Sequence, residues 1–150
     1  MQYFEDFSVG QKFASGRLTV DAVAIKSFAR EYDPQPFHLD DEAARESLFG
    51  GLAASGWHTA ALTMRLIVGS EFRPAGGILG FGGELAWLKP VRPDDELHVE
   101  AEILETRLSR SRPDQGIVSV RVATLNQHGD IVQTFTPALL VPLRAARSGA

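Results

Sequence analysis

The chain has 150 residues, of which 44% are apolar and 23% are charged, values typical of one globular domain. It contains no cysteine, which excludes disulfides, thiolate metal sites and a cysteine nucleophile. The formal net charge of −4 argues against a nucleic-acid-binding protein. No apolar run is long enough to cross a membrane and no signal peptide is recognisable, so we expect a cytoplasmic protein without a membrane partner.

The first third of the chain predicts two helices joined by a proline-rich bend. Residues 4–13 are interpreted as an entry segment, and Thr19 can cap the first helix. That helix ends at residues 33–36, because a residue that precedes proline avoids the α region. Asp40 is the predicted cap of a second, short helix that stops near Phe49.

A third helix is predicted from Gly56, where the chain reads GWHTAALTMRLIV to Val68. Apolar residues cover nearly every side of this segment, which is typical of a helix buried in the protein interior. Continued to Phe72, it would have about 17 residues and a length of about 25 Å.

From residue 78 onward, apolar and polar residues alternate with period two, which predicts strands with one solvated face. Pro137 indicates an edge strand or a bulge. Four antiparallel strands are expected, joined in part by a hairpin turn at residues 126–130, over residues 83–88, 97–103, 118–124 and 131–143.

These elements predict an α+β fold in which an antiparallel sheet wraps around the long buried helix. One domain would span residues 1–143, and residues 144–150 would form a frayed tail. A single curled sheet keeps an exposed edge, which favours pairing with a second copy of the chain.

The densest group of chemically capable side chains surrounds Asp33 and His38. Five residues separate them, so they would not meet on a regular helix or a straight strand. Pro34 and Pro36 supply a bend that can bring them together, and a carboxylate and an imidazole that share one water form a general acid/base pair. Alternatively, Asp33 caps the turn and His38 only precedes the next helix.

Gly56, at the head of the apolar helix, is the second candidate. A helix N-terminus without a side chain in the way can hold an oxyanion, whereas close packing is the alternative reason for a glycine. His58 lies one turn further and is interpreted as a core histidine. A metal site made by Asp33, His38 and His58 lacks a recognisable ligand spacing, so no metal is predicted.

These segments resemble the MaoC-like dehydratase family, which includes the (R)-specific enoyl-CoA hydratases and has the hot-dog fold. Its signature is Asp-x-Asn-Pro-x-His, with a glycine 18 residues after the histidine, and Asp33, His38 and Gly56 match it. The chain departs from the family at Gln35, which replaces the asparagine, and at Ser55, which stands where histidine is frequent. The resemblance is carried by residues 28–38, 49–51, 54–59, 87–91 and 94–95.

The resemblance implies a reversible hydratase that adds water to trans-2-enoyl-CoA and gives (3R)-hydroxyacyl-CoA, in fatty acid metabolism. Asp33 and His38 would be catalytic and Gly56 would form the oxyanion hole, with the pocket residues Gln35, Ser55 and Trp57. Coenzyme A would be part of the substrate, with no other cofactor, and the protein would be a homodimer. A hot-dog thioesterase and a non-catalytic acyl-CoA-binding protein are the alternatives.

Overall fold

A five-stranded sheet and four α-helices make up residues 1–144, the part of the chain that the structure, a computed structural model, describes. No helix in this range is long and apolar enough to span a bilayer. After a short 3₁₀ helix at Phe4–Asp6, the elements are β1 (Lys12–Thr19), α1 (Ala22–Tyr32), α2 (Pro36–Leu39), α3 (Asp41–Arg45), α4 (Gly56–Val68), β2 (Gly80–Trp87), β3 (Glu96–Leu108), β4 (Gln115–Leu125) and β5 (Ile131–Pro142).

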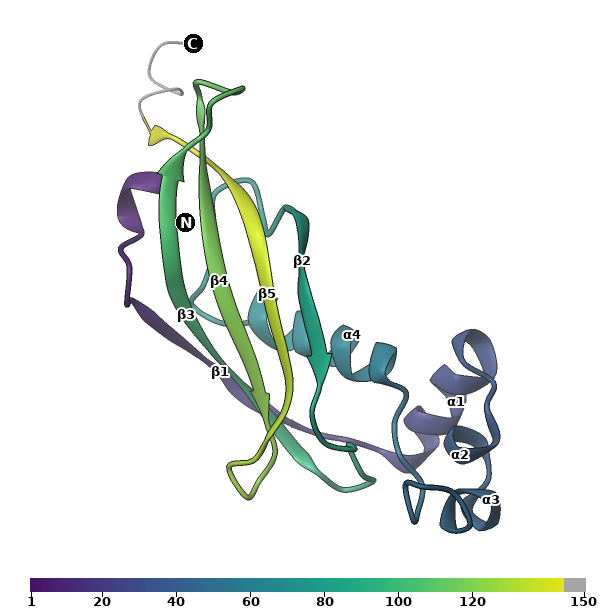
Figure 1. Cartoon of the computed structure of the whole chain (residues 1–150). Helices are drawn as coiled ribbons and strands as arrows, with labels where there is room; N and C mark the ends of the chain where they lie inside the picture. The colour runs from purple at the N-terminus through teal and green to yellow at the C-terminus, as the bar shows by residue number, and fades with distance from the viewer. Residues whose placement is uncertain (145–150) are drawn as a thin grey trace.

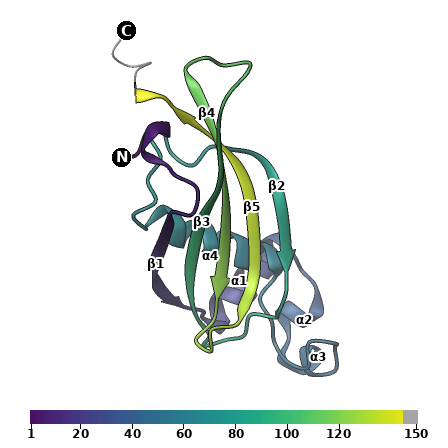
Figure 2. The same ribbon diagram turned by 60° about the vertical axis from the view of Figure 1, so that its left-hand side comes forward.

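The sheet is antiparallel, with the strand order β1-β3-β4-β5-β2, so that β1 and β2 form its two edges. The long hairpins β3–β4 and β4–β5 make its centre, where Val99 pairs with Thr124 and Val122 pairs with Phe135. The sheet curls around α4, as Figures 1 and 2 show from two sides. This is the α+β hot-dog fold that the sequence predicts.

Helix α4 buries one side against the concave face of the sheet. Thr63, Leu66 and Ile67 are buried there, and the Thr63 hydroxyl lies 2.6 Å from the hydroxyl of Thr124 on β4. Each aliphatic side chain of this size that leaves water stabilises the fold by about 1.5–3 kcal/mol. On the other side of the helix Trp57 and Val68 are exposed, so one chain covers only part of this apolar helix.

Strand β1 is the strand that the sequence analysis missed, and the short helix α2 was not predicted either. The residues of β1 alternate only between exposed and half-buried positions, and Gly16 with its polar neighbours weakens the period-two signal. Thr19 therefore ends a strand instead of capping a helix. The cap of α1 is Asp21, whose carboxylate accepts a hydrogen bond from the Val23 N–H at 3.0 Å.

Helix α4 ends at Val68, where the predicted apolar segment ends, and does not continue to Phe72. The Ser70 hydroxyl donates to the Ile67 carbonyl and accepts from the Phe72 N–H, which turns the chain. Helix α3 begins after its predicted cap, Asp40, but it ends at Arg45.

Of the two alternatives predicted for Pro137, the edge position is wrong, because Pro137 lies in β5, an inner strand; the irregular pairing of β5 with β2 at this point agrees with the bulge. Pro137 faces Gly83 of β2, where the pairing register shifts between Gly80 and Gly83. A Cβ atom on Gly83 would stand 2.7 Å from the Pro137 Cα, which explains the glycine. At the C-terminal end, Arg144 binds Glu5 and Asp6, and residues 145–150 of the predicted tail lie outside the described residues.

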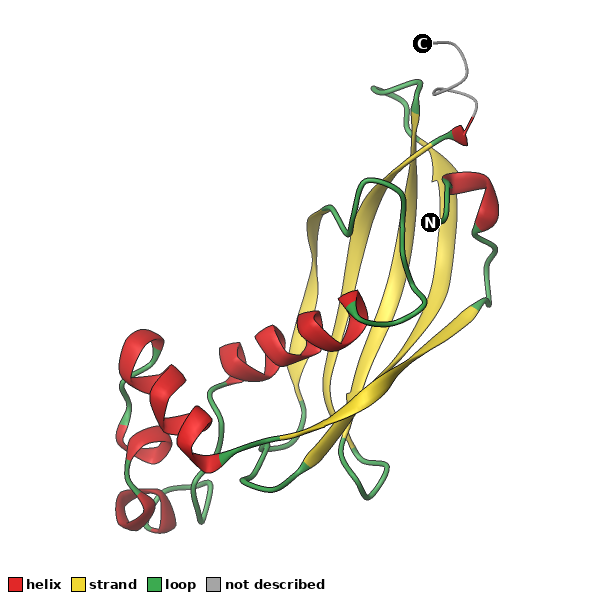
Figure 3. Ribbon diagram, turned by 180° about the vertical axis from the view of Figure 1, so that it is seen from behind, coloured by secondary structure: helices red, strands yellow, loops and turns green. Residues whose placement is uncertain are grey.

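Helices α1, α2 and α3 gather at the N-terminal end of α4, to one side of the lower part of the sheet (Figure 3). The loop between α3 and α4 is held by Arg92, whose guanidinium donates to the carbonyls of Phe49 and Gly51, the latter at 2.8 Å. This loop carries the backbone that leads into Ser55 and Gly56. Arg92 therefore fixes the loop that leads into the N-terminal end of α4.

Candidate active site

The proline-rich bend brings Asp33 and His38 together. Asp33 follows the last residue of α1 with φ −152° and ψ 67°, outside the helical region, and Pro36 starts α2 two residues before His38. The His38 N–H donates to the Gln35 carbonyl at 3.0 Å, which closes the turn. As a result, His38 Nε2 lies 3.3 Å from Asp33 Oδ2.

The other nitrogen of His38 has its own fixed partner. Nδ1 lies 2.6 Å from the carbonyl oxygen of Ala53, and His38 is only 4% exposed. A carbonyl oxygen only accepts hydrogen bonds, so Nδ1 carries a proton in this arrangement. Nε2, which faces Asp33, is therefore the nitrogen that can gain or lose a proton.

Both carboxylate oxygens of Asp33 accept hydrogen bonds from neighbouring side chains. The Ser55 hydroxyl donates to Oδ2 at 2.7 Å, and the Gln35 amide donates to Oδ1 at 2.5 Å. Burial acts to raise the pKa of Asp33, but these two bonds, together with the nearby His38, lower this pKa below its ordinary value. Asp33 is therefore ionised at neutral pH.

Gly56 opens α4, with Ser55 as its cap: the Ser55 hydroxyl accepts from the Trp57 N–H at 3.3 Å. As the first residue of the helix, Gly56 has an N–H without an acceptor inside the helix. A Cβ atom at this position would overlap the indole ring of Trp87 on β2. The glycine thus allows Trp87 to pack against the head of α4, a contact that the sequence does not reveal.

A cavity of about 430 Å³ lies between α4 and the sheet, and its walls are almost entirely apolar. It is lined by residues that include Trp57, Met64, Ile67, Phe72, Leu85 and Phe135. A second cavity, of about 310 Å³, lies at the head of α4. Its walls include His38, Gly56, Thr59, Trp87 and Lys89; Asp33 contacts His38 but does not itself line this cavity.

Two tryptophans stand at the boundary between these cavities. Trp57 lines the apolar cavity, Trp87 lines the cavity at the head of α4, and their rings pack edge to face at 5.1 Å. The Trp87 indole N–H donates to the buried Gln133 at 3.0 Å, and the Gln133 amide donates to Thr63 at 3.1 Å. Sequence reasoning gave Trp87 and Gln133 no role in the site, because two strand residues 46 positions apart meet only in the folded sheet.

The structure therefore joins five of the residues singled out in the sequence and separates two. Asp33, Gln35, His38, Ser55 and Gly56 form one continuous site. Trp57 points instead toward the apolar cavity. His58 is buried and stacks on Phe28 with ring centroids 4.7 Å apart; burial lowers the pKa of its imidazole, and its Nδ1 has no hydrogen-bond partner among residues 1–144.

The same architecture is found in known proteins. A family model for the MaoC-like domain matches residues 6–126. The crystal structure of a MaoC-like dehydratase from Rhodospirillum rubrum is 58% identical, with a TM-score of 0.93 over 96% of this chain and 99% of that one. The R-hydratase PhaJ1 from Pseudomonas aeruginosa is 27% identical, with a TM-score of 0.72 over 95% of this chain and 86% of that one.

A curated relative, the uncharacterized protein YdeM of Bacillus subtilis (strain 168), is 36% identical over 124 residues, which are 82% of this chain and 86% of that protein. The family match covers most of the chain, and the solved structures share its fold. The chain therefore belongs to the MaoC-like family of dehydratases and hydratases.

Proposed function

We propose that this protein hydrates trans-2-enoyl-CoA thioesters to (3R)-hydroxyacyl-CoA and catalyses the reverse dehydration. The observation that carries the proposal is the pair of Asp33 Oδ2 and His38 Nε2, 3.3 Å apart beside the free N–H of Gly56. A base that takes the proton of a water, a carboxylate that holds this water and an oxyanion donor together suit the addition of water to an activated double bond. Similarity to an R-hydratase supports the same reaction class.

In the proposed reaction the Gly56 N–H donates to the thioester oxygen, where negative charge develops. One water is held between Asp33 and His38. Its oxygen forms a bond to C3 while an O–H bond breaks and the proton moves to His38 Nε2. The electron pair of the double bond shifts toward the thioester, and C2 then takes the proton from Nε2, which restores the site.

The apolar cavity supplies the place for the acyl chain in this proposal. Its walls offer many apolar contacts and few hydrogen-bonding groups, which suits a hydrocarbon chain. The cavity at the head of α4 would hold the thioester, and the coenzyme A portion would leave past Lys89 toward solvent. The reaction uses only acid and base groups of this chain, and coenzyme A enters as part of the substrate.

Crotonyl-CoA tests the proposal directly. Loss of the enoyl absorbance without release of free thiol is the expected result. Release of thiol would instead indicate a thioesterase, and binding without either change would indicate an acyl-CoA-binding protein. Asp33→Asn and His38→Ala should lose turnover, whereas His128→Ala, which changes an exposed turn histidine, should keep the rate of the wild type.

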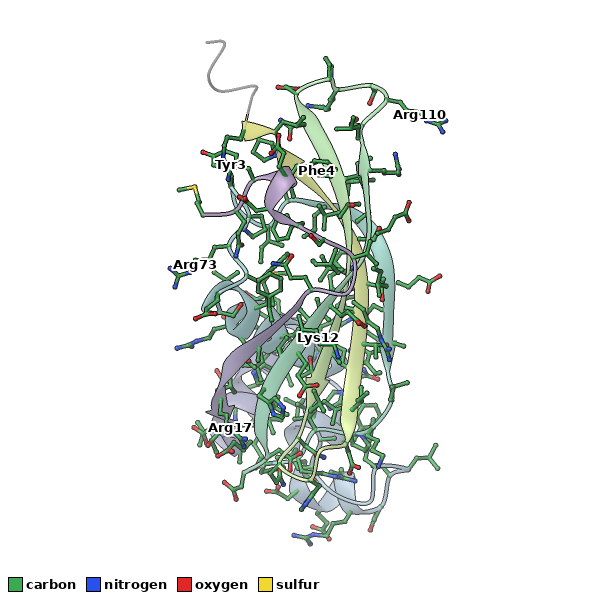
Figure 4. All side chains as sticks on the ribbon, turned by 90° about the vertical axis from the view of Figure 1, so that its left-hand side faces the viewer. Tyr3, Phe4, Lys12, Arg17, Arg73 and Arg110 are labelled. Carbon is green, nitrogen blue, oxygen red and sulfur yellow. The ribbon has the colours of Figure 1, made fainter. Side chains whose placement is uncertain are left out.

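We further propose that two copies pair through the β2 edge. Along this edge and its flanks the apolar side chains of Leu79, Phe81, Trp87 and Leu88 are 45–58% exposed. The β1 edge is different: Lys12 and Arg17 project from it (Figure 4), Arg17 pairs with Glu96, and such charged side chains are typical of edges that avoid pairing.

A stable pairing of this kind should bury more than about 1,600 Å² in total. Sedimentation should show a dimer at micromolar concentration, and Phe81→Glu should shift it toward the monomer. The matched change on the other edge, Ala14→Glu, should leave the dimer intact. A monomeric wild-type protein would contradict the proposal.

A further inference from the structure

Two side chains converge on the carboxylate of Asp33, and both occupy positions at which this chain departs from its family signature. Gln35 donates to Oδ1 at 2.5 Å, and Ser55 donates to Oδ2 at 2.7 Å. One approaches from the bend after α1 and the other from the cap of α4. Each carboxylate oxygen is thus held by a separate donor from a separate element.

The direction of the Ser55 hydrogen bond is fixed by its surroundings. Ser55 is fully buried, and its hydroxyl already accepts a hydrogen bond from the Trp57 N–H. A carboxylate only accepts, so the single hydroxyl proton of Ser55 must point to Asp33. A hydrogen bond from a neutral donor to an ionised acceptor is stronger than one between neutral groups, so it favours the charged form of Asp33.

Few charged groups near Asp33 act on its ionisation besides these hydrogen bonds. Among the described residues, His38 on α2 is the only titratable side chain that acts on the charge of Asp33. From α1, the neighbouring ring of Phe28 packs on Tyr32 and His58 rather than on the carboxylate. From α4, the cap residue Ser55 is the contact. The state of Asp33 is therefore determined by two neutral donors and one imidazole.

We infer that Ser55 and Gln35 are positioning residues that keep Asp33 a fixed anion, so that the proton taken from water travels only on and off His38 Nε2. The inference rests on the proposed function. In each turnover the water O–H bond breaks and an Nε2–H bond forms; that bond then breaks as C2–H forms. Asp33 holds the water and balances the imidazolium charge, without itself gaining a proton.

A titration of the Asp33 carboxyl carbon by ¹³C NMR tests the inference, with Asp33→Asn used to assign the signal. Ser55→Ala and Gln35→Met each remove one donor, and each should move the titration midpoint to higher pH, with a larger move in the double variant. Gln35 is exposed, so its replacement by the similarly sized methionine should leave folding unaffected. Ser55→Thr keeps a hydroxyl and should restore the wild-type midpoint.

Ser70→Ala is the matched control, because Ser70 is also buried at an end of α4, donates to a carbonyl and accepts from an N–H, but does not contact Asp33. It should leave the midpoint unchanged. In turnover, Ser55→Ala should lose about tenfold in kcat near neutral pH, more at lower pH, and little in KM.

An Asp33 midpoint that is the same in the wild type, Ser55→Ala and Gln35→Met would overturn the inference. A loss of kcat by the same factor at every pH would also overturn it, because a structural role of the cap predicts that result. The NMR titration needs no substrate. If the wild type hydrates no enoyl-CoA while the midpoints move as expected, the hydratase proposal fails and the assignment of Ser55 and Gln35 as donors stands.

Discussion

The head of α4 and its flank differ in almost every physical respect. At the head, His38 and Ser55 are buried and Asp33 is half-buried, and their polar side chains are hydrogen-bonded to one another or to the backbone. Along the flank, Met64 and Trp57 border an apolar cavity and remain partly exposed. The head of α4 is thus held by hydrogen bonds, whereas the flank offers an apolar cavity.

The two regions should therefore respond differently to substitution. A buried polar network loses its geometry when any member is removed, because each unpaired group costs about 1–3 kcal/mol. An apolar cavity tolerates exchange of its lining as long as volume is kept. We therefore expect changes at the head to alter the rate of the reaction, and changes along the flank to alter which acyl chain is accepted.

The largest effect is expected for the pair at the head. Asp33→Asn and His38→Ala should each lower kcat by about 10²–10⁴, without a change in preference between short and long enoyl-CoA substrates. Because the two groups act on one water, the double variant should be hardly slower than either single variant. Rate measurements on all three, with thermal melts as a control for folding, check this; independent, multiplying losses would mean that the residues do not act as a unit.

Substitutions of Gly56, which lies between the head and the flank of α4, are expected to have the next largest effect. Gly56→Pro removes the N–H, and its φ suits the first turn of a helix, but its Cβ would overlap the Trp87 ring as that of alanine does. We therefore expect it to lower the melting temperature like Gly56→Ala and, in addition, to lose about 10²–10³ in rate per folded molecule. Gly56→Ala keeps the N–H, but its methyl group would overlap the Trp87 ring, so it should mainly lower the melting temperature.

The double variant Gly56→Ala with Trp87→Ala distinguishes the two roles of this glycine. If packing alone excludes a side chain, the smaller residue at position 87 should recover the stability lost by Gly56→Ala. Turnover per folded molecule is the quantity to compare among the three proteins. A folded Gly56→Pro protein with the wild-type rate would remove Gly56 from the oxyanion site.

A smaller effect is expected along the flank. Met64→Trp fills part of the apolar cavity, so it should raise KM for long-chain enoyl-CoA by about tenfold and leave crotonyl-CoA unaffected. Val68→Trp is the control, because Val68 is exposed one turn further on the same helix and does not line the cavity. Equal KM changes for both chain lengths in Met64→Trp would contradict a role for this cavity in chain recognition.

The sequence predicts the head of α4 better than its flank, for a physical reason. Asp33, His38 and Gly56 lie within 24 residues of one another, and proline geometry and helix capping act over such short distances. The partner of His38, the Ala53 carbonyl, is a backbone atom and has no sequence signal. Trp87 and Gln133 meet only through the pairing of β2 with β5, which no local pattern reveals.

The strands of the sheet also differ in how well the sequence predicts them. The central strands β3, β4 and β5 have a buried and a solvated face, so the period-two pattern predicts them. The edge strand β1 has no fully buried residue, and therefore no such pattern. On α4 the apolar residues on every side predict a fully buried helix, but Trp57, Met64 and Val68 are exposed in the single chain.

The smallest expected effect is the pH dependence of stability that Asp33 confers. The pKa of Asp33 is lower in the folded protein than in the unfolded chain, so the unfolded chain binds more protons just below pH 4, and stability rises with pH in that window. The contribution is complete above the unfolded pKa, and it is lost as the pH falls through the folded pKa.

Urea unfolding of the wild type and Asp33→Asn at pH values from 6 down to about 2.5 measures this contribution as a difference in slope. The wild type should lose stability more steeply below pH 4 than the variant. Asp41→Asn removes an exposed carboxylate paired with Lys26, where solvent screens the interaction, so its slope should stay closer to that of the wild type. Parallel slopes for the wild type and Asp33→Asn would mean that the hydrogen bonds at the head of α4 do not stabilise the carboxylate, and the contrast between the two regions would lose its electrostatic part.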